Sequence, residues 1–160
     1  MMPQQKQSPG QALSKIKQYC SYQERCHEEV KQKLSDFGLS QYEIGQILGI
    51  LIEENFLNEE RFAIQFAGGK FRVKHWGKLK IKQELRQKKV SEYCIKIVIS
   101  AIDELAYRET LNKLASRKHE SLVNEKNPFL RKKKLLDHLH MKGYETDLVS
   151  DVVKQLLNKP

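Results

Sequence analysis

The chain has 160 residues, of which 39% are hydrophobic and 31% charged, and its formal net charge is +9. So low an apolar fraction favours several thin helices with polar faces over one thick core. Three cysteines without a C-x-x-C pair indicate neither a disulfide framework nor a zinc knuckle. With no secretory signal and no apolar run of about 20 residues, we expect a soluble, cytoplasmic protein without a membrane span. The positive charge favours an anionic partner.

The N-terminal third begins with residues 1–10, which are rich in glutamine and proline, so we expect a flexible tail there. A first helix is predicted over roughly Ala12–Cys20. The segments Ser21-x-x-Glu24 and Ser40-x-x-Glu43 each have the pattern of a capping box, which predicts a helix start at both places. Gly38 lies between them and is predicted to end the second helix.

The central third opens with a helix predicted over roughly Glu59–Phe71. Asn58 is its expected cap, and the acids Glu59 and Glu60 suit the positive end of a helix dipole without any further function. Gly68-Gly69 interrupts this helix, and two glycines in a helix interior predict fraying or a kink there. Ser91 is the expected cap of a buried helix that carries the β-branched run 95–99.

The C-terminal third begins with a helix predicted over roughly Leu105–Val123. Asn127-Pro128 then predicts a cap followed by proline at the first helical position, and Gly143 predicts a helix stop. The run Arg131–Lys134 places cations at a helix start, where they oppose the helix dipole. This placement weakly indicates binding, and a solubilising surface explains it equally well.

The apolar pattern of the first third recurs 51 residues later and, with a further shift of 54, once more. The matched positions are Ile44, Ile47, Leu48 and Leu51, then Ile95, Val98, Ile99 and Ile102, then Val149, Val152, Val153 and Leu156. Each set follows the i, i+3, i+4, i+7 spacing of a helix face. We therefore predict an all-α fold of three tandem three-helix repeats that form an elongated, curved, modular chain. The predicted boundaries are a tail at 1–10 and repeats at 11–58, 59–107 and 108–160.

A basic strip over residues 70–89 carries nine lysines and arginines against one acid, Glu84. Such a strip is typical of a surface that binds phosphates or acidic side chains, with Phe71 and Trp76 able to stack or anchor. The alternative is a solvated helix face on which Trp76 serves as a core or interface plug. The candidate partner-binding residues are Lys70, Arg72, Lys74, His75, Trp76, Lys78, Lys82, Arg86, Arg131 and Lys132.

Catalytic and metal-binding patterns are missing from the sequence. His138 and His140 are two residues apart and would diverge on a helix, and the adjacent pair Cys26-His27 has the wrong spacing for a nucleophile and its base. No Gly-rich phosphate loop, H-E-x-x-H or G-x-S-x-G occurs. We therefore expect no enzymatic activity, no cofactor and no metal.

Three segments together resemble the bacterial RecX regulatory proteins, over residues 11–157. They are Phe56-Leu-Asn-Glu-Glu-Arg-Phe-Ala-x-x-Phe66, Trp76-Gly-Lys-x-Lys-Ile-Lys-x-Glu-Leu85 preceded by Lys70-x-Arg72, and Ala12-Leu-x-x-Ile-x-x-Tyr-Cys-Ser-x-Gln-Glu-Arg25. The match departs from the family pattern at Gly68-Gly69, and the third repeat has lost most of the signature residues.

The resemblance implies an all-helical, non-enzymatic cytoplasmic protein that binds the filament of the RecA recombinase on single-stranded DNA. It further implies inhibition of the ATPase, recombinase and co-protease activities of RecA, with single-stranded DNA as a second contact within the filament. We expect a monomer. Two other hypotheses remain: a module that binds DNA or RNA directly, because three-helix units can offer a recognition helix, and a helical scaffold for another acidic protein.

Overall fold

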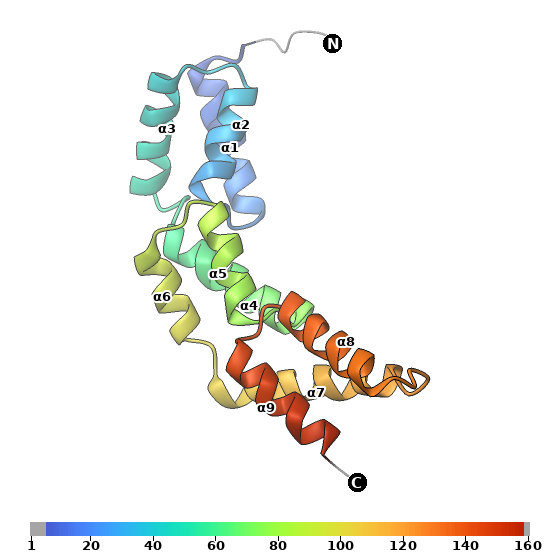
Figure 1. The fold of residues 1–160 in the computed structure, drawn as a ribbon. Helices are drawn as coiled ribbons and strands as arrows, with labels where there is room; N and C mark the ends of the chain where they lie inside the picture. Colours follow the sequence, from blue (N-terminus) through green and yellow to red (C-terminus); the bar gives the residue numbers. More distant parts are fainter. Residues whose placement is uncertain (1–5, 159–160) are drawn as a thin grey trace. The chain divides into compact units, whose positions relative to one another are not determined.

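The computed structural model describes residues 6–158, which form α-helices and connecting turns and contain no strand (Figure 1). This confirms the predicted all-α fold class. Residues 1–5 of the predicted tail lie outside the described residues. The helices are α1 (Pro9–Tyr22), α2 (His27–Asp36), α3 (Gln41–Glu53), α4 (Glu59–Lys74), α5 (Lys78–Gln87), α6 (Glu92–Ser100), α7 (Glu104–Ser121), α8 (Pro128–Met141) and α9 (Thr146–Leu157).

Two predictions near α1 were wrong. Ser8 is the N-cap of this helix and forms a reciprocal capping box with Gln11, with Pro9 in the first turn. The last three residues of the predicted tail therefore form the start of α1. Ser21 does not cap a helix, because it lies inside α1 and its hydroxyl donates to the Lys17 carbonyl at 2.8 Å. A serine inside a helix can bond back to the preceding turn in this way.

Helices α2, α5 and α8 end with the same turn, and the three turns are 51 and 54 residues apart, as the repeated sequence pattern predicts. At each end one residue has a positive φ: Gly38 at 84°, Lys89 at 59° and Gly143 at 97°. The N–H of the next residue donates to a leucine carbonyl five positions back, at 3.1–3.4 Å. This pattern is a Schellman motif. The helix stops predicted at Gly38 and Gly143 are confirmed.

Helices α3, α6 and α9 begin two residues after these turns. The capping box of Ser40 with Glu43 is confirmed, and the Ser91 hydroxyl accepts the N–H of Cys94 at 3.3 Å. Glu145 takes the N-cap position of α9 without a side-chain cap bond. Its carboxylate instead accepts a hydrogen bond from the hydroxyl of Tyr107. Asn127 caps α8 as predicted, by accepting two backbone N–H groups.

Helix α4 runs without a break through Gly68 and Gly69, so the predicted fraying is not found. The guanidinium of Arg72 lies over Gly68, and a Cβ atom at this position would come within 2.7 Å of Arg72 Nη1. The glycine therefore leaves room for a side chain one turn further along the helix. Within residues 6–158, no helix combines the length and apolar composition needed to cross a bilayer.

The chain divides into two compact units. The first contains the chain up to Phe66 together with Leu85–Ile95, and the second contains Ala67–Glu84 together with the chain from Lys96 onward. Helices α4, α5 and α6 are each divided between the two units, with one part in the first unit and the other part in the second. The boundaries of the predicted repeats stay a prediction.

In the first unit, α1, α2 and α3 pack pairwise against one another around an aliphatic core (Figure 1). The core side chains come from positions of helical spacing, such as Val30 and Leu34 on α2 and Ile44, Ile47 and Leu51 on α3. Each of them is almost completely shielded from water. Their burial is the main contribution to the stability of this unit.

In the second unit, α7, α8 and α9 pack pairwise in the same way (Figure 1), but the core contains two tyrosines. Tyr107 and Tyr144 are fully buried, with ring centroids 5.1 Å apart. A buried tyrosine needs a partner for its hydroxyl group. The partners of these two hydroxyls are what fix the connection between α4 and α5.

Candidate functional site

The candidate residues of the basic strip lie in both units. Lys70, Arg72 and Lys74 occupy the last turns of α4 in the second unit, and His75 and Trp76 form the connection to α5. Lys78 and Lys82 follow on the part of α5 that belongs to the same unit. Arg86 lies on the part of α5 that belongs to the first unit, while Arg131 and Lys132 lie near the start of α8.

The connection after α4 is held by its backbone. His75 has a positive φ of 58°, and its carbonyl accepts the hydroxyl of Tyr144 at 2.8 Å. The N–H of Trp76 donates to the carbonyl of Lys70 at 3.1 Å. The positive φ of His75 and these two hydrogen bonds fix the backbone of His75 and Trp76. The side chain of Trp76 therefore leaves the backbone in a defined direction. His75 therefore contributes its backbone to the second unit.

The indole of Trp76 is half-buried and lies outside the fully buried core. The Nζ atoms of Lys70 and Lys80 lie 4.9 and 4.6 Å from the centre of its ring system. Ammonium groups at this distance are attracted by the electron-rich face of an indole. The structure thus brings together one aromatic and two cations, one of which, Lys80, is not among the candidates predicted from the sequence.

Phe71 packs inside the second unit. Its ring centroid lies 5.9 Å from that of Tyr107, and the side chain packs against the core of α7, α8 and α9. The anchoring role that we considered for Phe71 is therefore filled by contacts within its own unit. The signal for this was its position one helical turn before the end of α4, where an apolar residue faces the core.

The first N–H groups of α5 are satisfied by other segments of the second unit. Gly77 N–H donates to the Lys142 carbonyl at 2.7 Å, and Leu79 N–H donates to the Gly143 carbonyl at 2.9 Å. Lys78 N–H donates to the hydroxyl of Tyr107 at 3.0 Å. The start of a helix has unpaired donors. Here the turn between α8 and α9 supplies two of the three acceptors, and Gly77 approaches Gly143 too closely for a Cβ atom.

The side chain of Lys78 forms its contacts inside the second unit. Its Nζ atom lies 3.2 Å from Glu104 Oε2 and 4.6 Å from the ring of Tyr107, and only 18% of the side chain is exposed. The Lys78 ammonium and then the Arg108 guanidinium lower the pKa of the Glu104 carboxyl by hydrogen bonding to it. An anionic partner would have to compete with Glu104, so we remove Lys78 from the candidate surface.

Three other candidates on α4 and α5 have no ion pair with any described residue. Arg72 and Lys74 are exposed on α4, and Lys82 is half-exposed on α5. A fourth cation, Lys142, donates from Nζ to the Lys74 carbonyl at 3.3 Å. We call Arg72, Lys74 and Lys82 the unpaired cations. The sequence repeat could have indicated Lys142, because it precedes Gly143, which takes the repeated turn position.

The remaining candidates differ in their availability. Arg86 donates two bonds to the carboxylate of Glu92, from Nε at 2.7 Å and Nη2 at 3.2 Å, and both side chains are mostly exposed. Arg131 is half-buried and donates to the Glu125 carbonyl from Nε at 3.1 Å and also from Nη2. Lys132 is exposed and pairs with no described residue. Arg131 thus serves its own loop, and only Lys132 is available on α8.

The described residues hold no group of three or more histidines, cysteines or carboxylates that could bind a metal ion. Burial raises the pKa of the Tyr107 hydroxyl, and its bond to Glu145 raises the pKa further, so this group stays protonated. What the unpaired cations and Trp76 offer is electrostatic attraction and stacking.

The chain matches the family model described as "RecX, second three-helix domain" over residues 58–99. It is 30% identical over 146 residues to "Regulatory protein RecX" of Prosthecochloris aestuarii, and the match covers 91% of this chain and 93% of the relative. It is 33% identical over 135 residues to the protein of the same name from Clostridium botulinum, covering 84% of this chain. Here the match spans only 63% of the relative's length.

Two solved structures have the same fold. A crystal structure of regulatory protein RecX superposes with a TM-score of 0.82 at 22% identity, covering 92% of this chain and 71% of the other. The crystal structure of RecX from Lactobacillus salivarius gives 0.81 at 20% identity, covering 92% and 96%. With the relative from Prosthecochloris aestuarii matched over nearly its whole length, the chain belongs to the RecX family of regulatory proteins.

Proposed function

We propose that this chain binds the RecA recombinase filament on single-stranded DNA and inhibits its recombinase, ATPase and co-protease activities, as a cytoplasmic, monomeric regulator without catalytic activity of its own. Membership in the RecX family supports this proposal. The choice of surface rests on the unpaired cations, Arg72, Lys74 and Lys82, which are exposed or half-exposed on the parts of α4 and α5 that belong to the second unit.

Cations without an internal partner keep their charge available for an anionic surface. An exposed lysine that is already paired gives up one ion pair to form another, and the net gain is then small. Arg72, Lys74 and Lys82 have no such pair to give up among the described residues. Acidic walls of the filament, DNA phosphates, or both would meet them, and salt would weaken the contact.

Filament binding is tested with a fluorescently labelled chain titrated with RecA filaments on single-stranded DNA in the presence of a slowly hydrolysed nucleotide. Naked single-stranded DNA and RecA without DNA are the two matched titrations. We expect saturable binding to the filament that is at least about tenfold tighter than binding to naked DNA and weakens as salt rises. Filament binding no tighter than binding to naked DNA would contradict the proposal.

The second candidate function is direct recognition of DNA or RNA without RecA. The observation in its favour is the aromatic ring of Trp76 with Lys70 and Lys80 close to it. A base can stack on such a ring while lysines contact phosphates. In the same titrations, this function gives tight binding to naked single- or double-stranded DNA and no gain from RecA.

A further inference from the structure

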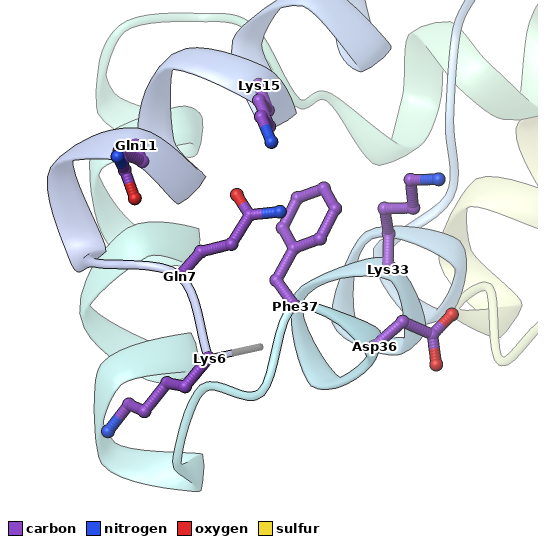
Figure 2. Close-up of a pocket in the computed structure, with 7 residues that line it drawn as sticks. All are labelled: Lys6, Gln7, Gln11, Lys15, Lys33, Asp36 and Phe37. Atoms are coloured by element: carbon purple, nitrogen blue, oxygen red, sulfur yellow. The ribbon is translucent and has the colours of Figure 1, made fainter. Parts of the chain in front are cut away.

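A pocket of about 570 Å³ opens in the first unit, where the segment before α1 lies against the end of α2 (Figure 2). Its volume lies in the range of small-molecule sites. The lining residues that matter here are Lys6, Gln7, Lys15, Lys33, Asp36 and Phe37. Three of these are lysines and one is an acid, so the pocket has a net positive lining.

The walls of this pocket are fixed by contacts of the chain itself. Gln7 N–H donates to the Phe37 carbonyl at 2.9 Å, which ties the segment before α1 to the end of α2. Lys6 Nζ pairs with Glu43 Oε1 at 3.2 Å. Gly38 has a φ of 84°, and a Cβ atom there would lie 3.0 Å from the Cα of Lys6. The turn therefore requires glycine, and the pocket is formed without a ligand.

The ring of Phe37 lies at the centre of the pocket. It packs against the core of the first unit and also lines the pocket. Figure 2 shows the amide group of Gln7 and the amine of Lys15 directed toward this ring. The Nζ atoms of Lys15 and Lys33 lie 5.9 and 5.6 Å from its centroid. A flat ring with two ammonium groups close by can stack a base and hold its phosphate.

The side-chain oxygen of Gln7 favours a ligand that carries a hydrogen-bond donor. Its Oε1 atom is buried and has no hydrogen-bond partner in the described part of the chain. A buried acceptor without a partner is unfavourable, and a ligand N–H group would satisfy it. The Oδ1 of Asp36 already accepts from Gln32 Nε2 at 3.0 Å, and the three lysines outnumber the single negative charge of this acid. The pocket therefore favours an anion that also carries an N–H donor.

We propose that this pocket binds a nucleoside monophosphate unit. The base stacks on Phe37, its exocyclic amine donates to Gln7 Oε1, and the phosphate lies against Lys15 and Lys33. The unit is either a free nucleotide or one nucleotide of a single strand. The inference goes beyond the proposed function, since all lining residues belong to the first unit and the unpaired cations belong to the second.

The proposal is tested by titrating the full ¹⁵N-labelled chain with AMP at low salt and following backbone amide shifts. We expect one saturable site, with the largest shifts at Gln7, Lys33 and Phe37. Purine riboside 5′-monophosphate lacks the exocyclic amine and should bind more weakly, and inorganic phosphate weaker still. Absence of saturable AMP binding, or phosphate binding as tight as AMP, overturns the proposal.

Matched lysine variants distinguish a contact with the phosphate of AMP from a general effect of surface charge on AMP binding. Lys33→Gln should raise the dissociation constant of AMP at least about fivefold, because a charge-assisted bond to phosphate is lost. Lys31→Gln on the same helix is exposed, lies outside the pocket and should change it less than about twofold. Equal effects of the two variants would contradict the proposed site.

Gln7→Leu tests the donor requirement without depending on charge. It removes an unsatisfied buried acceptor, so the chain should fold at least as stably as the wild type while AMP affinity falls to that of purine riboside 5′-monophosphate. Unchanged AMP affinity in this variant contradicts the assigned role of Gln7. No RecA is present, so failure here leaves the filament proposal standing, and the reverse also holds.

The source of the nucleotide is assigned with a short single strand of deoxyadenylate. If the strand shifts the same amides and binds more tightly than AMP, the pocket takes a nucleotide of a nucleic acid strand. If AMP binds and the strand does not, the pocket takes a free nucleotide. Either result supports the pocket. If AMP shifts the amides of the pocket and the strand shifts only other amides, the pocket likewise takes a free nucleotide.

Discussion

The hydroxyl of Tyr107 on α7 accepts the backbone N–H of Lys78 at the start of α5, at a distance of 3.0 Å. The same hydroxyl donates to the carboxylate of Glu145, the N-cap of α9. One buried side chain thus joins the ends of two helices of the second unit. The connection between α4 and α5, which carries Trp76, is held by this arrangement.

Tyr107→Phe should lower the free energy of unfolding by about 1–3 kcal/mol, because it leaves the Lys78 N–H and the Glu145 carboxylate without their shared partner. Urea denaturation followed by circular dichroism measures this change. Tyr93→Phe is the matched control, since Tyr93 is 73% exposed, and it should change stability by less than about 0.5 kcal/mol. Similar effects of the two variants would show that the hydroxyl network of Tyr107 does not stabilise the unit.

Gly143→Ala should destabilise the second unit by at least about 2 kcal/mol. Gly143 has a φ of 97°, and a Cβ atom there would collide with Lys80 Cβ and approach its backbone N to 2.6 Å. Gly45→Ala is the control, because Gly45 lies inside α3 with open space around it, and it should stabilise the chain by about 0.5–1 kcal/mol. Thermal unfolding of both variants gives the comparison, and a stable Gly143→Ala variant would be the contrary result.

Lys89 takes the position that glycine takes in the other two turns. Its φ of 59° strains a side chain with a Cβ atom, and its ion pair with Glu28, at 3.6 Å, is largely exposed. We expect Lys89→Gly to raise the free energy of unfolding by up to about 1 kcal/mol, and Lys89→Val to lower it by about 1–2 kcal/mol. Chemical denaturation of the two variants should give this order, and the reverse order would rule out backbone strain at Lys89.

The helical repeat could be predicted from the sequence because it depends on local patterns. Apolar positions at i, i+3, i+4 and i+7 and the turn glycines Gly38 and Gly143 each act within one or two helical turns. Ser21 misled the prediction because it lies in the last turn of α1, where its hydroxyl bonds to the preceding turn, while Glu24 lies in the connection that follows. At Lys89 only the repeat gave a signal, by aligning it with Gly38 and Gly143, since nothing in its residue type predicts a positive φ.

The candidate site could be predicted only in part, because the availability of a cation depends on distant partners. Lys78 and Lys82 look equivalent in the sequence, yet Glu104 pairs with Lys78 from 26 positions away. Local spacing does not contain this information. The same is true of Gln7, whose unsatisfied Oε1 depends on the fold of the segment before α1.

His138 should make stability depend on pH. Burial first, and then the nearby charges of Lys118 and Lys142, lower the pKa of its imidazole below the ordinary value. The unfolded chain therefore binds a proton at higher pH than the folded chain does. The stabilising effect is complete above about pH 6.5 and is lost as the pH falls through the lower, folded pKa.

This prediction is checked by comparing urea midpoints at pH 7.5 and pH 5. We expect the wild type to lose stability over this range and His138→Gln to lose less of it. His140→Gln, at an exposed position of the same helix, should behave like the wild type. An unchanged pH dependence in His138→Gln would assign the loss to other groups.

The proposed binding of the unpaired cations to the RecA filament is tested by the single-stranded-DNA-dependent ATPase of the cognate RecA. The titration uses the wild-type chain, the combined variant Arg72→Gln, Lys74→Gln and Lys82→Gln, and a control that removes three exposed charges elsewhere. The control positions are Lys96, Lys113 and Lys154, all exposed and without an ion pair to a described residue.

We predict that the wild type and the control inhibit the ATPase with half-inhibition concentrations within about twofold of each other, while the combined variant requires at least about tenfold more protein. Circular dichroism should show the same helicity for all three. Absence of inhibition by the wild type, or equal inhibition by the combined variant and the control, would contradict the account.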